Sequence, residues 1–304
     1  MSFRDLISCI LAIIILVCLC SEVVSQDAAQ NNAVNWVDGY VSAVGEATAT
    51  PSGNKIKDEM RAVRAATILG QRALLETLKG VRIDSHTKVE NLILQNDSVN
   101  ADVSGMIQSA RIAGQSVRWR GEMPVAKVEL RICLGGYGVC AAEKSIVNVL
   151  GLGHKNEQSG TPDRRLDDFS IKREKITSGS KDITYDLTMP VTGIVFNLQG
   201  INYERVILPV IITTDNENKF YTVYSVKSVE PRVIRTYGVV RYANTVDQAR
   251  RNPYLGGNVL VVPVYDVTKD NMIIVEPHIA KIIQETTCHG NNYFKDAKIV
   301  ISAR

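Results

Sequence analysis

The chain has 304 residues, of which 45% are hydrophobic, 22% charged and 6% aromatic. These proportions are typical of a folded globular protein and exclude a largely disordered chain, a collagen-like chain and a membrane protein with many spans. The 35 Lys and Arg residues are interleaved with 32 Asp and Glu, so the formal net charge of +3 does not favour nucleic acid as a partner.

The N-terminal 25 residues are the first segment whose pattern indicates a particular function. Arg4 precedes an apolar run from Leu6 to Cys20, which is shorter than the roughly 20 residues that a membrane-spanning helix needs. Small or modest side chains follow the run. This pattern predicts a signal peptide at 1–25, cleaved before Gln26. An uncleaved anchor and a lipoprotein acylated at Cys20 are the alternatives.

Export would leave three cysteines, Cys133, Cys140 and Cys288, in an oxidising compartment. Cys133 and Cys140 lie on either side of the glycine-rich stretch Leu-Gly-Gly-Tyr-Gly-Val, so their spacing predicts a disulfide across a turn. Two unlinked, buried thiols are the alternative. A structural zinc site needs about four Cys or His ligands. The four histidines are scattered along the chain, so we expect no metal.

The first predicted domain covers residues 34–145 and combines one long helix with several strands. Periodicity and turn residues predict a bent strand at 37–49, a helix at 55–78, a strand at 81–89, and two hairpin strands at 107–119 and 125–134. This order indicates an α+β layer in which the helix packs on an antiparallel sheet.

The long helix has a clear apolar periodicity. Residues at spacings of three and four define its expected buried face, which small alanine side chains widen. The members of this face are Ile56, Met60, Val63, Thr67, Gly70, Leu74 and Leu78, together with Ala62, Ala65, Ala66 and Ala73.

A linker at 146–185 and a second domain at 186–304 complete the predicted organisation. The regular pattern is lost where Gly, Ser, Pro and charged residues accumulate. It returns as a second, mixed α/β domain. The predicted elements there are strands at 191–198, 206–213, 221–226, 233–242 and 259–267, a helix at 277–285 and a last strand at 297–301.

Two stretches resemble known families. The run Ala65–Ser85 (AATILGQRALLETLKGVRIDS), continued by Val128–Ile132, resembles the bacterial LPP-twenty lipoprotein family, whose members include the flagellar accessory proteins FlgP and FlgT. That resemblance implies an envelope protein that builds an assembly and performs no catalysis. A second stretch, starting at residues 192–200, is similar to a C-terminal module of longer relatives. Asn197 and Gln199 replace the usual Asp and Arg of its motif.

The chain offers little material for catalysis. Its glycine clusters match neither a phosphate-binding loop nor a dinucleotide fingerprint, and no Gly-x-Ser-x-Gly motif occurs. Cys288 and His289 are adjacent, and such neighbours usually point apart. Asp167 and Asp168 lie in the predicted linker. We therefore expect no enzyme and no cofactor, and rank an enzyme with an unrecognised site third.

The leading hypothesis is a non-enzymatic, secreted or periplasmic, outer-membrane-associated structural protein of a bacterial envelope, such as a flagellar or surface-assembly accessory. Its expected partners are copies of itself or other envelope proteins. Tyr40, Val44 and Trp119 are candidates for an interaction face, because one helix covers only one face of a sheet. Packing against the second domain is the other interpretation. The alternative function is a binding module that holds a peptide or glycan between the domains.

Overall fold

The computed structural model describes residues 33–140, 144–152, 164–165, 186, 188–198, 200–288 and 292–303. They belong to one unit, 32–304. The predicted signal peptide and most of the predicted linker, including Asp167 and Asp168, lie outside the described residues. The cleavage site and the domain boundaries therefore stay predictions.

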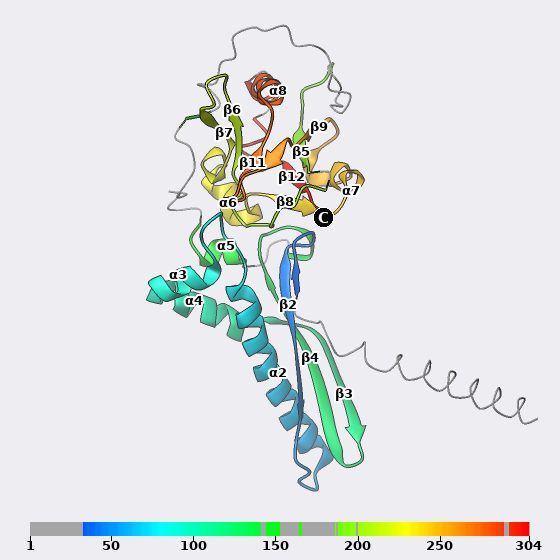
Figure 1. The fold of residues 1–304 in the computed structure, drawn as a ribbon. Coiled ribbons are helices and arrows are strands. Elements are labelled where there is room, and N and C mark those ends of the chain that lie inside the picture. Colours follow the sequence, from blue (N-terminus) through cyan, green and yellow to red (C-terminus); the bar gives the residue numbers. More distant parts are fainter. Residues whose placement is uncertain are drawn as a thin grey trace, which may run out of the picture. The chain divides into compact units, whose positions relative to one another are not determined.

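The first part of the described chain contains a four-stranded antiparallel sheet in the order β1-β2-β4-β3 (Figure 1). Its strands are β1 (Ala33–Asn35), β2 (Tyr40–Thr48), β3 (Arg111–Arg120) and β4 (Met123–Cys133). The predicted hairpin is confirmed, since β3 and β4 pair antiparallel around a turn at Gly121, whose φ is +61°.

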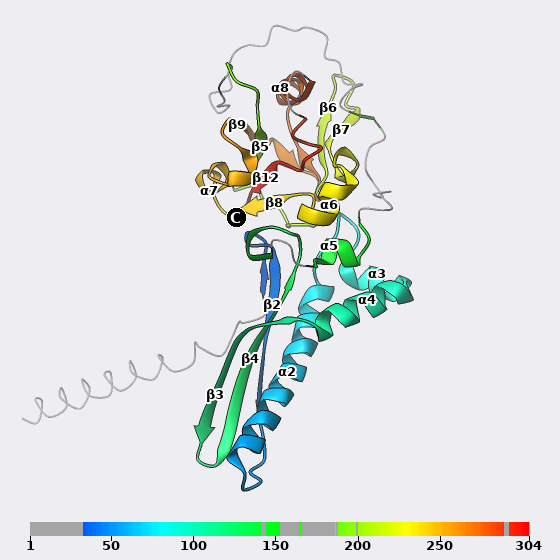
Figure 2. The same cartoon turned by 180° about the vertical axis from the view of Figure 1, so that it is seen from behind.

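The long helix α2 (Lys55–Lys79) packs on one face of this sheet, as Figures 1 and 2 show from opposite sides. Asn54 caps its N-terminus by accepting a hydrogen bond from the Lys57 backbone nitrogen at 3.1 Å. The buried Asp58 carboxylate accepts from the Ser52 backbone nitrogen at 2.8 Å, which joins the preceding loop to the helix. The predicted helix on an antiparallel sheet is confirmed.

The buried face of α2 differs from the predicted one at its N-terminal half. Small residues at every fourth position, Ala62, Ala66 and Gly70, pack on the sheet, whereas Ile56 and Met60 are exposed. Small side chains let the helix backbone approach the strands closely, and that approach turns the larger side chains outward.

The predicted strand at 81–89 is wrong. The buried Asp84 carboxylate accepts hydrogen bonds from the backbone nitrogens of His86 and Thr87, which closes an Asx-type turn in place of a strand. Two helices follow, α3 (Val89–Gln95) and α4 (Asp97–Gln108).

The second part of the chain is built on two further sheets. One has the order β10-β11-β6-β7 and mixes parallel with antiparallel pairs. The other, β8-β12-β5-β9, is entirely parallel. Their strands are β5 (Gly193–Asn197), β6 (Ile211–Thr214), β7 (Phe220–Tyr224), β8 (Arg241–Ala243), β9 (Val259–Pro263), β10 (Asp266–Val267), β11 (Ile273–Ile274) and β12 (Ile299–Ser302).

Four helices accompany these later elements: α5 (Ile146–Val149), α6 (Pro231–Tyr237), α7 (Val246–Arg250) and α8 (Pro277–Cys288). The mixed α/β character and the helix that begins at Pro277 are confirmed. The predicted strand at 233–242 is wrong over most of its length, because Pro231 starts α6 and Gly238, with a φ of +82°, ends it.

Direct backbone contacts join the two parts. The Ile207 nitrogen donates to the Arg82 carbonyl oxygen at 3.1 Å, and the Leu208 nitrogen donates to the Ile83 carbonyl oxygen at 2.7 Å. One hydrophobic cluster runs from β2 and α2 to β12. In the described part of the chain, no helix is both long enough and apolar enough to span a bilayer.

Candidate interaction surface

Strand β3 is the outermost strand of the first sheet. It pairs with β4, and the described residues place no strand on its other side. Of its ten residues, Gly114 and Val117 are half-buried and the rest are exposed. An edge strand of this length offers backbone groups to which a further strand can add. We therefore treat β3 as the candidate interaction surface.

Two of the predicted face residues, Tyr40 and Val44, lie on the sheet face that points away from α2. Val44 is opposite Glu129 on β4. The Arg131 guanidinium lies 4.0 Å from the Tyr40 ring centroid and pairs with Glu129 at 3.3 Å. Because both Tyr40 and Val44 are half-buried, this face mixes apolar and charged side chains. Its role in binding stays a prediction.

The third predicted face residue, Trp119, does not share that face. It is opposite Pro124, which is on the same side of β4 as the buried Ala126 and Val128, and so it points to the side of α2. The Lys55 ammonium at the start of α2 lies 5.6 Å from its ring centroid. Sequence alternation misplaced Trp119 because a β-bulge between Ile112 and Gly114 shifts the register of β3.

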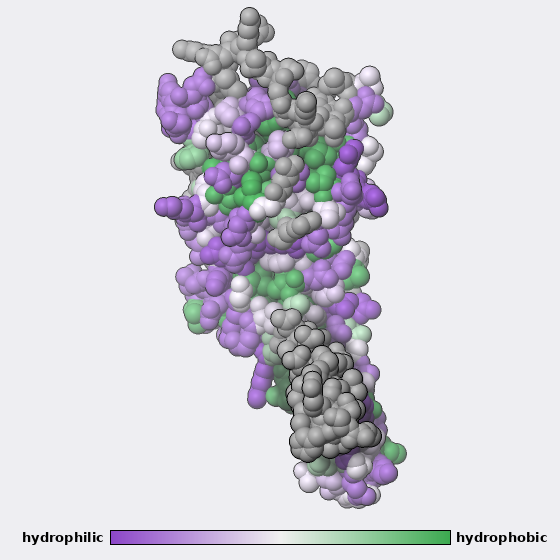
Figure 3. Space-filling model, turned by 45° about the vertical axis from the view of Figure 1, so that its right-hand side comes forward, coloured by the Kyte–Doolittle hydropathy of each residue, from purple (hydrophilic) through white to green (hydrophobic). Residues whose placement is uncertain are grey.

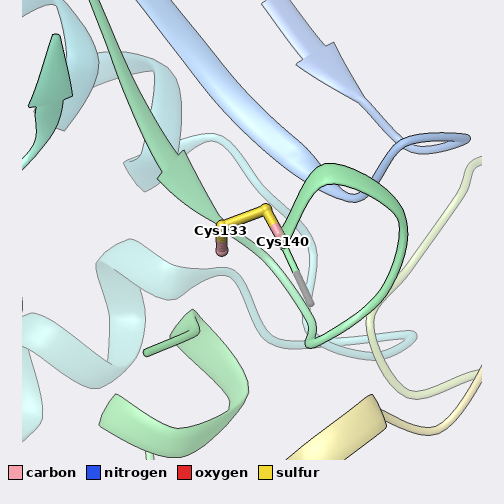
Figure 4. Close-up of a disulfide and its surroundings, with 2 residues drawn as sticks. All are labelled: Cys133 and Cys140. Atoms are coloured by element: carbon pink, nitrogen blue, oxygen red, sulfur yellow. A yellow bond between two sulfur atoms is a disulfide. The ribbon is translucent and has the colours of Figure 1, made fainter. Parts of the chain in front are cut away.

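The predicted disulfide between Cys133 and Cys140 is supported by the structure (Figure 4). Their sulfur atoms are 2.02 Å apart and their Cα atoms 5.6 Å apart. The bridge connects the end of β4 to the far side of the glycine-rich loop. It therefore closes this loop as the sequence predicted.

The loop that the disulfide closes contacts the second part of the chain directly. A Cβ atom on Gly136 would be 1.7 Å from the carbonyl oxygen of Thr236 in α6, so only glycine fits there. The Tyr137 hydroxyl donates to the Trp36 carbonyl oxygen at 3.2 Å. The glycines that looked like turn residues in the sequence thus also provide a close contact between distant segments.

Arg241 is the central charged group of this junction, and sequence analysis missed it. It is 4% exposed, and its guanidinium carbon lies 3.4 Å from the Tyr254 ring centroid and 5.3 Å from the Tyr137 ring centroid. Its Nη1 donates to the Ala297 carbonyl oxygen at 3.3 Å. Burial lowers the pKa of Arg241. The run Val-Val-Arg-Tyr-Ala at 239–243, in which a lone charge sits among apolar residues, is the sequence signal for such a site.

A neighbouring network surrounds Tyr242. Its hydroxyl donates to the Val206 carbonyl oxygen at 2.8 Å and accepts from the Val206 nitrogen at 3.1 Å. Its ring contacts Trp36 edge-on at 5.4 Å between centroids. Burial raises the pKa of Tyr242 to about 12. The hydrogen bonds hold the segment between β5 and β6 against β8, and the ring contact joins β8 to Trp36 in the first part of the chain.

The described residues offer no arrangement that points to a reaction. No group of three or more His, Cys, Asp and Glu side chains within the described ranges could hold a metal ion. Cys288 is the last residue of α8, and His289 lies outside the described residues. Several buried tyrosines and Arg241 have shifted pKa values and are held in packed contacts, and a hydrogen bond from the Ser52 backbone lowers the pKa of the buried Asp58. These contacts suit structural roles.

Comparison with known proteins found a family model that matches part of the chain. Residues 193–303 match a family model described as the second domain of Tp0624 from Treponema pallidum. The match runs from β5 to β12 and lies inside the predicted second domain. No curated protein matches the chain. The second part of this chain is therefore similar to a domain of a bacterial protein.

Proposed function

We propose that this chain is an exported, non-enzymatic structural protein of a bacterial envelope, which assembles with copies of itself or with other envelope proteins by strand pairing at β3. The observation that carries the proposal is the edge strand Arg111–Arg120, which is exposed along nearly all its length. Long, exposed edge strands favour association, and natural proteins usually shorten, cover or charge them. In β3 the charged residues are at the two ends, and the stretch 112–117 between them has none.

Four further observations support an envelope protein. The similarity of residues 193–303 is to a domain of a bacterial protein. The apolar N-terminal run predicts export to the periplasm or beyond, and the disulfide at Cys133 and Cys140 suits an oxidising compartment. The resemblance of Ala65–Ser85 to the LPP-twenty lipoproteins favours an outer-membrane-associated accessory, for example of a flagellum or surface assembly.

The junction between the two parts favours assembly over ligand binding in a cleft. The cavity lined there by Trp36, Tyr137 and Tyr242 encloses about 20 Å³, enough for about one water molecule. Ligand pockets usually hold about 300 to 1,000 Å³. A peptide or glycan would need this junction to open, whereas strand addition at β3 needs no rearrangement.

Adding charge to the edge strand tests the proposal. Ile112 and Ser116 are exposed on β3, and a double variant, Ile112→Lys with Ser116→Lys, should block pairing with another strand by charge repulsion. Leu94→Lys is the matched control, because Leu94 is 78% exposed on α3. Analytical ultracentrifugation should show assemblies for the wild type and the control, and a monomer for the double variant with unchanged circular dichroism.

Two results would overturn this function. If the wild-type chain sediments as a monomer at high concentration, and in-cell crosslinking yields no crosslinked product, the chain does not assemble. Assemblies that survive in the double variant would place the contact elsewhere than β3.

A further inference from the structure

One end of the first sheet carries large apolar side chains that nothing in the described structure covers. We define this apolar-basic end as residues 55–64 of α2 and 118–123 of the β3–β4 hairpin. Both segments lie at the same end in Figures 1 and 2, and Lys55 contacts Trp119 there. Ile56 is 74% and Met60 69% exposed, and Trp119 and Met123 are also exposed. Met123, next to Pro124, points to the other face of the sheet. Single exposed apolar residues are common, but Ile56, Met60 and Trp119 lie on the α2 side of one end and indicate a binding surface.

The same end is basic. The two segments contain six Lys and Arg residues and three Asp and Glu residues. Arg118 and Arg120 alternate with Trp119 and point to the other face of the sheet, so the α2 segment by itself supplies four basic residues against two acids. One of the three acids, Asp58, is buried and paired with Arg61 at 3.7 Å. Nearby Glu46 is opposite Lys127, so this pair adds no net charge. The end therefore attracts anionic surfaces.

Apolar and basic side chains alternate along the exposed side of α2. Ile56 and Met60 are one turn apart, and with Lys57, Arg61 and Arg64 they line a shallow hollow. In Figure 3, hydrophobic and hydrophilic residues lie side by side at the lower end of the molecule, where grey atoms do not cover them. Apolar side chains next to basic ones can bind a membrane interface, with the apolar groups in the acyl boundary and the basic groups at the phosphates.

We propose that the apolar-basic end docks on an anionic phospholipid surface. Ile56, Met60 and Trp119 would enter the interface, where Trp is enriched, while Lys57 and Arg64 bind lipid phosphates. A second copy of this end is a poorer occupant, because it carries the same excess of positive charge. The inference deepens the membrane association in the proposed function and is independent of assembly through β3.

Vesicle binding by the exported chain tests this docking. Flotation with vesicles of equal parts phosphatidylglycerol and phosphatidylcholine should show binding, and vesicles of phosphatidylcholine alone should bind far less. Ile56→Asp with Met60→Asp should abolish binding. Lys57→Gln with Arg64→Gln should weaken it by about fivefold for each basic residue removed. Leu94→Asp, which places one acidic residue at another exposed apolar position, should bind like the wild type.

The outcomes separate this docking from the proposed function. Binding that survives in Ile56→Asp with Met60→Asp, at unchanged circular dichroism, would overturn the proposal and point to the N-terminal segment as the anchor. Loss of lipid-free assemblies in that variant would show that the end contacts protein instead. If Ile56→Asp with Met60→Asp no longer binds vesicles but still forms assemblies through β3 in the ultracentrifuge, both proposals stand. If the wild type binds no anionic vesicle, the docking fails while the function remains.

Discussion

Gly45 on β2 and Gly70 on α2 bring the backbones of strand and helix into direct contact. A Cβ atom on Gly45 would lie 2.3 Å from the Gly70 nitrogen and 1.9 Å from the Ala66 carbonyl oxygen. Real Cβ atoms do not approach backbone atoms so closely, and neither partner is a flexible side chain. This contact sets the distance between the helix and the sheet.

Replacing Gly45 by a larger residue should therefore destabilise the fold. Gly45→Ala must push α2 away from β2, and we expect it to lower the free energy of unfolding by about 3 kcal/mol or more, as overpacking of a core does. Chemical denaturation measures the change. Gly105→Ala is the control, because a Cβ atom there meets nothing within 4 Å and α4 should gain about 0.5 to 1 kcal/mol. Equal stability of the wild type and Gly45→Ala would contradict the close contact.

The disulfide predicts a specific labelling pattern. In the native, exported protein without reductant, thiol reagents should modify neither Cys133 nor Cys140. Replacing both by Ser should lower the free energy of unfolding by about 2.5 kcal/mol, since the bridge closes a short loop in the unfolded chain. The measurements are mass spectrometry of labelled protein and denaturation of the variant. Labelling of all three mature cysteines would show that the bridge does not form.

Replacing Arg241 by Lys should destabilise the protein, although both residues carry a positive charge. Its planar guanidinium stacks on Tyr254 at 3.4 Å, and a Lys ammonium cannot stack in this way. We expect Arg241→Lys to lower the free energy of unfolding by about 1 kcal/mol, part of the roughly 2 kcal/mol of a desolvated cation–π contact, because the ammonium keeps the charge and loses the stacking. Arg235→Lys, at an exposed position of α6, should be neutral. A similar small effect at both positions would argue against a structural role of the stack.

The buried tyrosines predict a loss of stability in alkali. Burial raises the pKa of Tyr242 from its ordinary 10.0 to about 12, so the folded chain keeps a proton that the unfolded chain loses. The unfolded state then binds fewer protons between these values, and the free energy of unfolding falls as pH rises through that window. Denaturation at several pH values checks the slope, which Tyr242→Phe should flatten. A native protein whose phenols all ionise near their ordinary pKa would contradict this.

The N-terminal prediction needs a direct measurement. If residues 1–25 are a signal peptide, N-terminal sequencing of the exported protein should begin at Gln26. The intact segment would indicate a retained anchor. An acylated Cys20 at the N-terminus would indicate a lipoprotein.

The sequence by itself determined the elements whose signals are local. The long helix over residues 55–78 and the hairpin around Gly121 follow from spacings that depend on contacts between near neighbours in the chain. The disulfide followed from two cysteines around a glycine-rich turn. Local patterns failed at 81–89 and 233–242, where the Asp84 turn and a helix between Pro231 and Gly238 replaced apolar alternation.

Only the tertiary structure decided which faces are buried. Both sides of α2 carry apolar residues, and the side with Ala66 and Gly70 packs because Gly45, distant in sequence, leaves room for the backbone. Ile56 and Met60 are exposed for the same reason. Likewise, Arg241 is buried because aromatic rings from separate segments surround it. Such contacts depend on which surfaces meet in space, and the periodicity of one segment contains no information about its partner.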